Sequence, residues 1–450
     1  MNGDTIVALA TAPLPAGVAV IRLSGPRALE VGTWLVPRLH HADAGKLVFG
    51  PIGNGLDDGM AVKFAAPRSF TGEDVVEIHT HGGRAVVQAV LDACTAFDDV
   101  RQALPGEFSR RAVMNGKMDI TAAEGLADLI DATTEAQRRQ ALRQLDGALG
   151  KRFETWRTHV LALLAQVEAA IDFPDEELEV LAEPALAAGM KDLLADLQAA
   201  AQEKAGERLR DGVRLAIVGK PNAGKSTLLN LLAGRDVAIV SPIAGTTRDV
   251  VTSTLDIGGF PVVVADTAGL RNTEDAIEAE GVKRARAQAL AADVVVAVVD
   301  GHDFPQALDE LAPLLVEDRT LLVVSRAEMF ELDFPSKHQG FPVVAANLTE
   351  QEALRRILPA LTNLVENVAG GAAEAALLTR VRHRAAVDDA IAHLGNALAM
   401  VLKAAHHGTS VAELVAEDLR SAANAIGTVT GRTGSEDVLD VVFSSFCIGK

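Results

Sequence analysis

The chain has 450 residues, of which 49% are hydrophobic and 23% are charged; this composition is typical of folded domains and excludes wholesale disorder. Its length favours about two to four domains. The 42 basic and 61 acidic residues give a net charge of −19, which argues against a protein that coats nucleic acid through its overall charge and leaves RNA docking only to a local basic patch.

Two cysteines, Cys94 and Cys447, exclude a disulfide framework and indicate a reducing compartment. No run of about 18 apolar residues and no signal-peptide pattern is present, so we expect a soluble, cytoplasmic protein without a membrane span.

The first 117 residues have the pattern of short strands and turns. Strand-like segments at 6–8 and 18–23 are separated by prolines and glycines, and the apolar spacing of 85–97 predicts a helix. From about residue 120 to residue 170, and again from 184 to 205, apolar side chains recur every three or four residues. This spacing predicts long helices packed as a bundle.

A third pattern begins at Val213, where apolar strand-like runs alternate with helical segments. The runs are 213–218, 262–265, 294–299, 320–324 and 342–345, and they predict a mostly parallel sheet with helices on both faces. After Gly370 and Gly371 the chain is helical again almost to its end. This order predicts a helical domain interrupted by an inserted α/β domain whose two ends lie close together.

The segment from Gly219 to Ser226 matches the P-loop pattern, with an apolar strand before it and a helix after it. In such a loop, backbone N–H groups wrap the phosphates of a nucleotide. Lys225 would reach the β- and γ-phosphates as a catalytic residue, and Ser226 would ligate Mg²⁺. The candidate nucleotide-binding residues are Asn222, Ala223, Gly224, Lys225, Ser226 and Thr227.

Two further segments follow in the order found in GTPase switch regions. In Gly-Thr-Thr-Arg-Asp at 245–249, Thr247 would complete the Mg²⁺ shell and sense the γ-phosphate. In Asp-Thr-Ala-Gly at 266–269, Asp266 would point to the metal and the Gly269 amide to the γ-phosphate. The further candidate nucleotide contacts are Ser241, Thr246, Thr247, Asp266, Thr267, Ala268 and Gly269. Together with the P-loop, they predict a nucleotide-hydrolysing switch domain.

Several separated motifs are distinctive in combination. They are Asp-Thr-Ile-Val-Ala at 4–8, Pro-Gly-Glu-Phe-Ser-Arg-Arg-Ala at 105–112 with Asn-Gly-Lys at 115–117, Ile-Asp-Phe-Pro-Asp-Glu-Glu at 171–177, Asp-Thr-Ala-Gly-Leu-Arg at 266–271 and Phe-Cys-Ile-Gly-Lys at 446–450. Over essentially the whole chain, this combination resembles the MnmE (TrmE) family of tRNA uridine-modification GTPases. The last motif is the most specific, because most GTPases have no reason to end in Cys-x-Gly-Lys.

The resemblance implies a multidomain fold in four segments. These are an N-terminal α+β domain for folate binding and dimerisation at 1–117, the first part of a helical bundle domain at 118–211, an inserted Ras-like P-loop G domain at 212–370, and the second part of the helical domain, with the terminal motif, at 371–450. The interruption of the helical domain is also expected from the sequence pattern. The homodimer and the folate come from the resemblance alone.

The resemblance also implies a folate site with contacts from Arg22, Glu77, Lys117 and Lys450. Arginine and lysine suit the carboxylates of a folate, and Glu77 suits the donor edge of the pterin. Each of these residues could instead be a surface charge or a member of an ion pair. Cys447 is implied as a catalytic residue of tRNA modification, either a nucleophile or a general acid.

The sequence lacks two groups that usually assist GTP hydrolysis. Leu270 stands where Ras-like proteins carry a water-orienting glutamine, and no arginine finger is obvious. By the resemblance, Glu278 would position the attacking water; the alternative is a solvated helix glutamate. A potassium ion would replace the finger. Its ligands would come from Asn222, Ser241, Ile243 and Thr246.

The guanine-recognition motif departs from the family pattern. Instead of Asn-Lys-x-Asp, the strand at 320–324 is followed by Ser-Arg-Ala-Glu at 325–328, and a later Ser-Ala pair is replaced by Ala345-Ala346. Glu328 can still accept two guanine donors, although its side chain is one methylene longer than aspartate. We expect GTP to be preferred over ATP by less than in relatives with the full motif.

The leading hypothesis is a Mg²⁺- and K⁺-dependent GTPase that works in a heterotetramer with an FAD-containing partner of the MnmG (GidA) type. The pair would add a carboxymethylaminomethyl or aminomethyl group to C5 of the wobble uridine of certain tRNAs, with 5-formyl- or 5,10-methylene-tetrahydrofolate carrying the one-carbon unit. One alternative is a ribosome- or RNA-binding switch GTPase without modification chemistry. A second is an inactive scaffold with a decayed base pocket.

Overall fold

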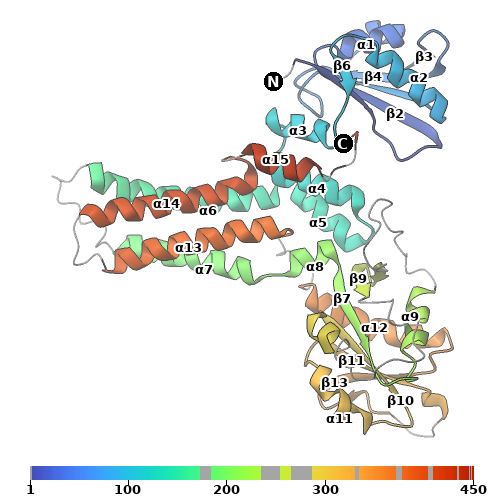
Figure 1. Cartoon of the computed structure of the whole chain (residues 1–450), viewed down its shortest axis with the longest axis vertical. Helices are drawn as coiled ribbons and strands as arrows, with labels where there is room; N and C mark the ends of the chain where they lie inside the picture. Colours follow the sequence, from blue (N-terminus) through green and yellow to red (C-terminus); the bar gives the residue numbers. More distant parts are fainter. Residues whose placement is uncertain are drawn as a thin grey trace. The chain divides into compact units, whose positions relative to one another are not determined.

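The computed structural model describes residues 3–172, 184–234, 254–264, 286–329, 334–370, 378–403, 409–432, 435–444, 446 and 448–449. Contacts divide the chain into two compact units, which are described separately. One unit holds residues 1–127, 145–161 and 423–450, and the other holds residues 128–144 and 162–422. Figure 1 shows the elements of both units and labels most of their helices and strands.

A six-stranded sheet forms the centre of the first unit (Figure 1). Its order is β3 (Val48–Ile52), β4 (Asp57–Phe64), β5 (Val75–Gly82), β2 (Ala16–Ser24), β1 (Thr5–Leu9) and β6 (Val100–Gln102), and every pair is antiparallel except β1 with β6. Helices α1 (Ala28–Leu35) and α2 (Arg84–Thr95) cover one face, and a short 3-10 helix, η1 (Pro37–His41), follows α1. Their aliphatic core includes Cys94, and burial raises the pKa of its thiol to about 12. Cys94 is therefore a packing residue rather than a reactive thiol.

Helix α3 (Glu107–Met114) covers part of the opposite face of this sheet. Its Phe108 packs with Ile6, Ala8 and Phe70 in a small separate core. Helices α4 (Ile120–Asp131) and α15 (Ser435–Ser444) form another core, in which Ile120 and Ala123 meet Leu439, Val442, Phe443 and Phe446. The apolar side chains Leu439, Val442, Phe443 and Phe446 near the end of the chain are thus anchored by packing.

A seven-stranded sheet lies in the second unit. Its order is β12 (Lys337–His338), β13 (Phe341–Ala346), β11 (Thr320–Ser325), β10 (Val294–Asp300), β7 (Val213–Val218), β9 (Phe260–Val264) and β8 (Thr254–Ile257), with antiparallel pairs only at the two edges. Helices α8 (Ala205–Asp211), α9 (Lys225–Ala233) and α12 (Glu352–Val368) share the core on one face, and α11 (Ala307–Leu311) belongs to the core on the other. Short 3-10 helices are η4 (Ala312–Leu314) and η5 (Ala327–Met329). The predicted sheet, mostly parallel and covered on both faces, is confirmed.

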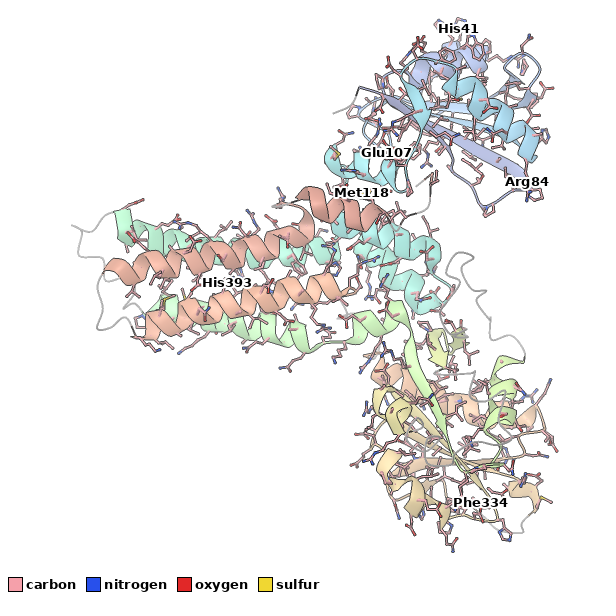
Figure 2. All side chains as sticks on the ribbon, viewed as in Figure 1. His41, Arg84, Glu107, Met118, Phe334 and His393 are labelled. Carbon is pink, nitrogen blue, oxygen red and sulfur yellow. The ribbon has the colours of Figure 1, made fainter. Side chains whose placement is uncertain are left out.

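The remaining helices are α5 (Glu135–Leu145), α6 (Ala148–Asp172), α7 (Pro184–Gln202), α13 (Val381–Lys403) and α14 (Thr409–Thr430). The helical stretch predicted from 120 to 170 is divided at Thr134, whose hydroxyl accepts the N–H of Gln137, and at Gly147, which has φ +82°. His393, which Figure 2 labels on α13, pairs with Asp418 on α14 at 2.9 Å. Helix α13 is long and apolar enough to cross a membrane, a test that core helices of soluble proteins also pass, and it packs against α7.

Candidate functional site

The P-loop lies between β7 and α9, as the sequence predicts. Gly224 has φ +102°, and a Cβ at Gly219 would lie 2.3 Å from the carbonyl oxygen of Val298, so both positions require glycine. The Nζ of Lys225 donates to the carbonyl oxygens of Gly219 and Lys220 at 2.9 and 2.8 Å. Burial lowers the pKa of this ammonium group. An anion bound in the loop would offset that burial cost, which is the role expected of nucleotide phosphates.

Two side chains at the end of β11 contact the P-loop backbone. The buried Ser325 hydroxyl donates to the carbonyl oxygen of Ala223 at 2.8 Å. The guanidinium of Arg326 pairs with Asp300 at 2.5 Å and donates to the carbonyl oxygen of Asn222 at 3.4 Å. The altered base motif therefore still ties the P-loop to the end of the sheet.

Other described residues of the predicted nucleotide site and of its base motif lie at the start of α9, in η5 and at the end of β13. Ser226 and Thr227 are exposed at the start of α9, and Glu328 is exposed in η5. Ala345 and Ala346 end β13 without a polar side chain. Glu328 is thus the acidic side chain of the motif that could meet a base.

Arg22 and Glu77 pair across β2 and β5. The Nε and Nη2 of Arg22 both reach Oε1 of Glu77, at 2.9 and 2.8 Å. The guanidinium also lies over the rings of Phe70 and Phe108, 5.4 and 5.7 Å from their centroids. Cation–π contact and the ion pair together fix Arg22 beneath α3.

Lys117 is linked to the same region through the loop between β4 and β5. Its Nζ donates to the carbonyl oxygen of Pro67 at 2.9 Å, three residues before Phe70. The structure therefore brings Arg22 and Glu77 into contact, and it places Lys117, which follows α3, against the loop that supplies Phe70, one of the rings over Arg22.

In the C-terminal tail, the segment that follows α15, Gly449 lies against the end of β1. Gly449 has φ +95°, and a Cβ there would be 2.0 Å from the carbonyl oxygen of Leu9. Phe443 and Phe446 stack edge to face with 5.0 Å between their ring centroids, and both pack on Gly106 at the start of α3. The tail backbone thus reaches the sheet that carries Arg22.

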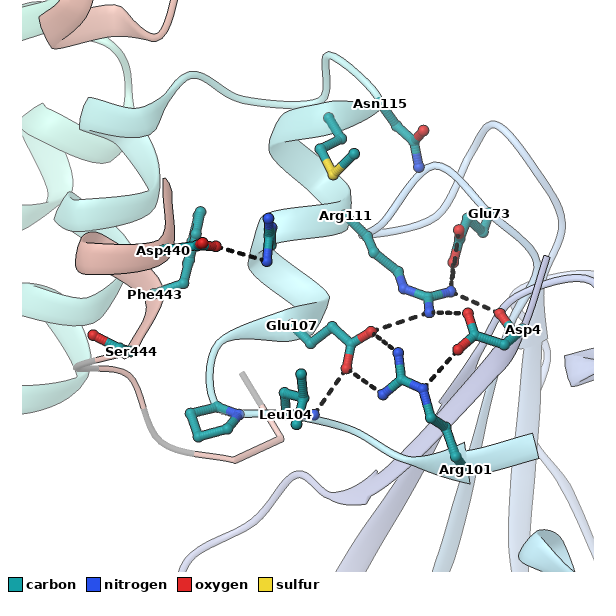
Figure 3. Close-up of a pocket in the computed structure, with 13 residues that line it drawn as sticks. Asp4, Glu73, Arg101, Leu104, Glu107, Arg111, Asn115, Asp440, Phe443 and Ser444 are labelled. Atoms are coloured by element: carbon teal, nitrogen blue, oxygen red, sulfur yellow. Dashed lines mark hydrogen bonds and ion pairs between the residues drawn. The ribbon is translucent and has the colours of Figure 1, made fainter. Parts of the chain in front are cut away.

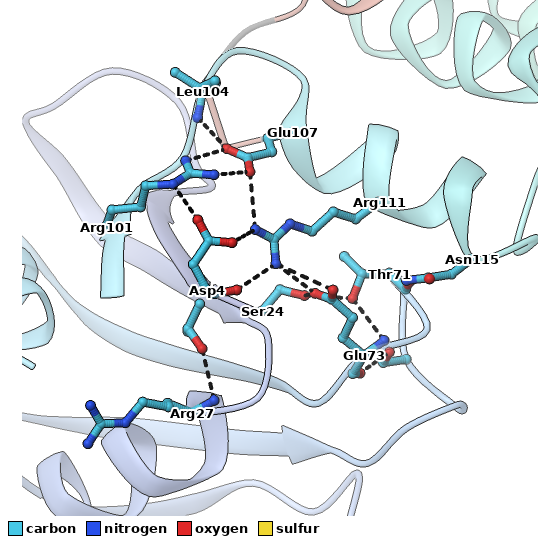
Figure 4. Close-up of polar contacts among 12 residues, drawn as sticks. Asp4, Ser24, Arg27, Thr71, Glu73, Arg101, Leu104, Glu107, Arg111 and Asn115 are labelled. Carbon is cyan, nitrogen blue, oxygen red and sulfur yellow. Dashed lines mark hydrogen bonds and ion pairs between the residues drawn. The ribbon is translucent and has the colours of Figure 1, made fainter. Parts of the chain in front are cut away.

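A cavity of about 530 Å³ lies between α3 and α15 (Figure 3). A network of ion pairs lines it: Arg101 pairs with Glu107 and Asp4, both at 2.6 Å, and Arg111 pairs with Asp4 at 2.9 Å, Glu107 at 3.1 Å and Glu73 at 3.2 Å (Figure 4). The two remaining charged residues of the lining, Arg110 and Asp440, pair with each other at 3.0 Å. Every charge in the cavity has a partner of opposite sign, so the network reads as structural support for α3 rather than a ligand site.

Glu107 is the centre of this network. Burial alone would raise the pKa of its carboxyl group, but hydrogen bonds from Arg101, from the Leu104 N–H and from Arg111 hold that pKa below its usual value. Glu107 is therefore ionised at neutral pH and stabilises α3 in that form.

Two family models match the chain: the GTP-binding protein TrmE N-terminus over residues 5–117, and the MnmE helical domain over residues 120–447. The tRNA modification GTPase MnmE of Rhodospirillum rubrum is 48% identical over 466 aligned residues, which cover 100% of both chains. Its counterparts in Caulobacter vibrioides and Parvibaculum lavamentivorans are 47% and 48% identical, each over 99% of this chain and 100% of the relative. The chain belongs to the MnmE family.

Solved structures resemble this MnmE family member less closely. The G domain of the T. maritima FeoB iron transporter is 25% identical, with 35% of this chain and 98% of that domain covered and a TM-score of 0.26. The family assignment therefore rests on the sequence matches.

Several residues implicated by the MnmE pattern lie outside the described residues. They are Ser241, Ile243, Thr246, Thr247, Asp266, Thr267, Ala268, Gly269, Glu278, Cys447 and Lys450. Their roles stay predictions.

Two features of the site were not predicted from the sequence. The hydrogen bond from Ser325 to the P-loop joins residues about a hundred positions apart, and no local pattern signals it. In the Arg101–Arg111 network, the i,i+4 spacing of Glu107 and Arg111 is a signal for one ion pair. Asp4 and Glu73 join that network only through the fold.

Proposed function

We propose that this protein is a K⁺-dependent GTP hydrolase that acts with an MnmG (GidA)-type FAD protein on the wobble uridine of certain tRNAs. The pair would add a carboxymethylaminomethyl or aminomethyl group to C5, with a tetrahydrofolate as the source of the one-carbon unit. Membership of the MnmE family carries this proposal, because the family pattern extends over the whole chain.

We propose four segments for the architecture: residues 1–117 for folate and dimerisation, 118–211 and 371–450 for a split helical domain, and 212–370 for an inserted Ras-like G domain. Support comes from the order of elements, since α4–α8 precede the seven-stranded sheet and α13–α15 follow it. An inserted domain of this kind can move as a body while both connections stay attached to the helices.

For hydrolysis, we propose that Lys225 releases its two loop carbonyls and binds the β- and γ-phosphates. Ser226, Thr247 and Asp266 provide hydroxyl and carboxylate oxygens, which are the ligand types that Mg²⁺ prefers. The K⁺ ligands would come from Asn222, Ser241, Ile243 and Thr246. Bound Mg²⁺ and K⁺ would neutralise charge that develops on the phosphates, and Glu278 would hold the attacking water.

For the one-carbon carrier, we propose contacts from Arg22, Glu77, Lys117 and Lys450. Arg22 is already oriented by two rings and by Glu77, so a ligand meets a fixed pair of charges. The contact of Gly449 with Leu9 supports a tail that brings Cys447 and Lys450 to this sheet. Cys447 would then act in tRNA modification and not in GTP hydrolysis.

We propose a homodimer formed through the open part of this sheet face. Val18, Phe49 and Met60 are 54%, 62% and 39% exposed, and strand register places them on the face away from the core of α1 and α2. Exposed apolar side chains that share a face are typical of protein contacts. A cytoplasmic location, a heterotetramer with the MnmG-type partner, and tRNA as substrate follow from family membership.

Binding of 5-formyl-tetrahydrofolate to the purified full-length protein tests the proposal, with GTP turnover in KCl and NaCl measured in parallel. We expect saturable folate binding that Arg22→Ala removes, and turnover that is at least severalfold faster in K⁺. GTP turnover without folate binding would instead favour an RNA-binding switch GTPase. Equal turnover in the two salts would refute the potassium site.

A further inference from the structure

His79 has a buried ring nitrogen without a partner. It lies on β5 two residues after Glu77, so both side chains point to the same face of the sheet. The Nε2 of His79 is buried and has no hydrogen-bond partner, and Oε2 of Glu77 lies 3.9 Å away, too far for a hydrogen bond. A buried polar atom of this kind costs free energy unless a ligand or a water supplies the missing bond.

The surroundings of His79 form a strip that suits a flat heterocycle. His79 pairs in register with Val20 of β2 and Met60 of β4. Arg22 and Glu77 pair with each other two residues further along the same strands, on the same face. The strip is therefore polar along Arg22, Glu77 and His79, with aromatic rings at one end and apolar side chains beside His79.

The C-terminal tail approaches this strip from β1. The Ala10 N–H donates to the carbonyl oxygen of Val20 at 2.7 Å, and Gly449 lies against Leu9 and Ala10. His79 pairs with Val20, Val20 pairs with Ala10, and Ala10 contacts Gly449, so neighbouring strands link His79 to the tail.

We propose that His79 is a positioning residue of the folate site, whose Nε2 hydrogen-bonds the heterocycle beside the atoms that Glu77 binds. This inference rests on the proposed folate function. Both bonds from Arg22 go to Oε1 of Glu77, and Oε2 is the oxygen near His79. A 2-amino-4-oxo pyrimidine ring presents two donors followed by an oxygen acceptor, which matches a carboxylate followed by a ring N–H.

His81 provides a matched control on the same strand. It is two residues further along β5, its side chain is 73% exposed, and its Nδ1 already pairs with Asp57 at 2.8 Å. A change at His81 removes an imidazole from the same face without touching the unpartnered nitrogen.

The test compares His79→Gln, His79→Leu and His81→Leu in the full-length protein. Glutamine places an amide near the position of Nε2, whereas leucine removes all hydrogen bonding. We expect His79→Leu to weaken 5-formyl-tetrahydrofolate binding about tenfold, the loss expected for one buried hydrogen bond. His79→Gln should stay within about threefold of the wild type, and His81→Leu should match it.

Thermal unfolding without folate gives a second readout. Because His79→Leu removes an unsatisfied buried nitrogen, its unfolding temperature should rise by about 2 °C. Unchanged folate affinity in His79→Leu overturns the proposal, and so does an equal loss in the glutamine and leucine variants with lowered unfolding temperatures, which would assign the effect to ring packing. A wild-type protein that binds no folate removes the folate site itself, and the role of His79 with it.

Discussion

The P-loop takes its backbone, Lys225 and the proposed metal ligand Ser226 from one stretch of eight residues, 219–226, whereas the Arg22–Glu77 region is assembled from β2, β5, the loop before β5 and α3, with the C-terminal tail against the neighbouring strand β1. A local site keeps its geometry as long as its strand and helix form. An assembled site depends on packing between segments that are distant in sequence. Changes outside the Arg22–Glu77 contact should therefore disturb it while the P-loop keeps working.

Gly449→Ala is expected to show the largest difference between the two regions, with a strong effect near Arg22 and Glu77 and a small effect on the P-loop. A Cβ at this position meets the Leu9 carbonyl oxygen at 2.0 Å, and the backbone has φ +95°, so the tail must leave the end of β1. We expect wobble-uridine modification to be lost and folate binding to weaken strongly, with GTP turnover within about threefold of the wild type.

Gly45→Ala is the control for Gly449→Ala, because Gly45 has φ +81° but open space around its Cβ position. It carries the same backbone strain without the contact. If both glycine variants behave like the wild type, the tail does not belong to the folate region.

The next largest effect is expected from Arg111→Ala, which leaves Asp4, Glu73 and Glu107 without this partner. Removal of one member of a fully buried ion pair costs about 3 kcal/mol or more, and this partly buried network should lose somewhat less. We expect urea unfolding followed by tryptophan fluorescence to show this loss, and nucleotide affinity to stay unchanged. Arg138→Ala breaks a solvent-exposed pair with Glu135, which water screens, and should lower the free energy of unfolding far less.

The sequence predicts the local parts of the molecule well. Strands such as 213–218 and 320–324 are composed mainly of apolar residues, and the glycines and lysine of the P-loop lie in one motif. Helices α1 and α3 were not predicted, because each has only eight residues, about two helical turns, and so short a segment does not establish a clear apolar period. The Arg22–Glu77 contact follows from the register of β2 and β5, which pairs residues 55 positions apart and has no local signal.

The pH dependence of the free energy of unfolding tests the ion-pair network around Glu107, which lies in the same unit as Arg22 and Glu77. The folded-state pKa of Glu107 is lowered, so its contribution to stability is present above the unfolded value of about 4.3 and is lost as pH falls through the lower folded value. We expect Glu107→Gln to be less stable than the wild type by about 1–3 kcal/mol at pH 7. That difference should shrink as the pH falls from about 4.3 through the lower folded-state pKa. A difference that is constant over this range would contradict the assigned ionised state.

The smallest effects are expected in the base motif. Glu328→Asp restores the usual carboxylate length and should tighten GTP binding by about 1 kcal/mol without changing ATP binding. Ser325→Asn should change GTP affinity by less than about 0.5 kcal/mol, because the Ser325 hydroxyl already bonds the Ala223 carbonyl oxygen at 2.8 Å. Titration with a fluorescent nucleotide measures both. A larger gain from Ser325→Asn than from Glu328→Asp would show that Ser325 limits base recognition.

Mass spectrometry of wobble uridines tests the central claim most directly, namely that this chain couples a GTPase to tRNA modification. Transfer RNA would be taken from cells lacking the protein and from the same cells supplied with the wild type, Lys225→Ala or Arg22→Ala. We predict that the C5 substituent is missing without the protein, returns with the wild type, and stays missing with either variant. Wobble uridines that remain fully modified in cells lacking the protein would contradict the account.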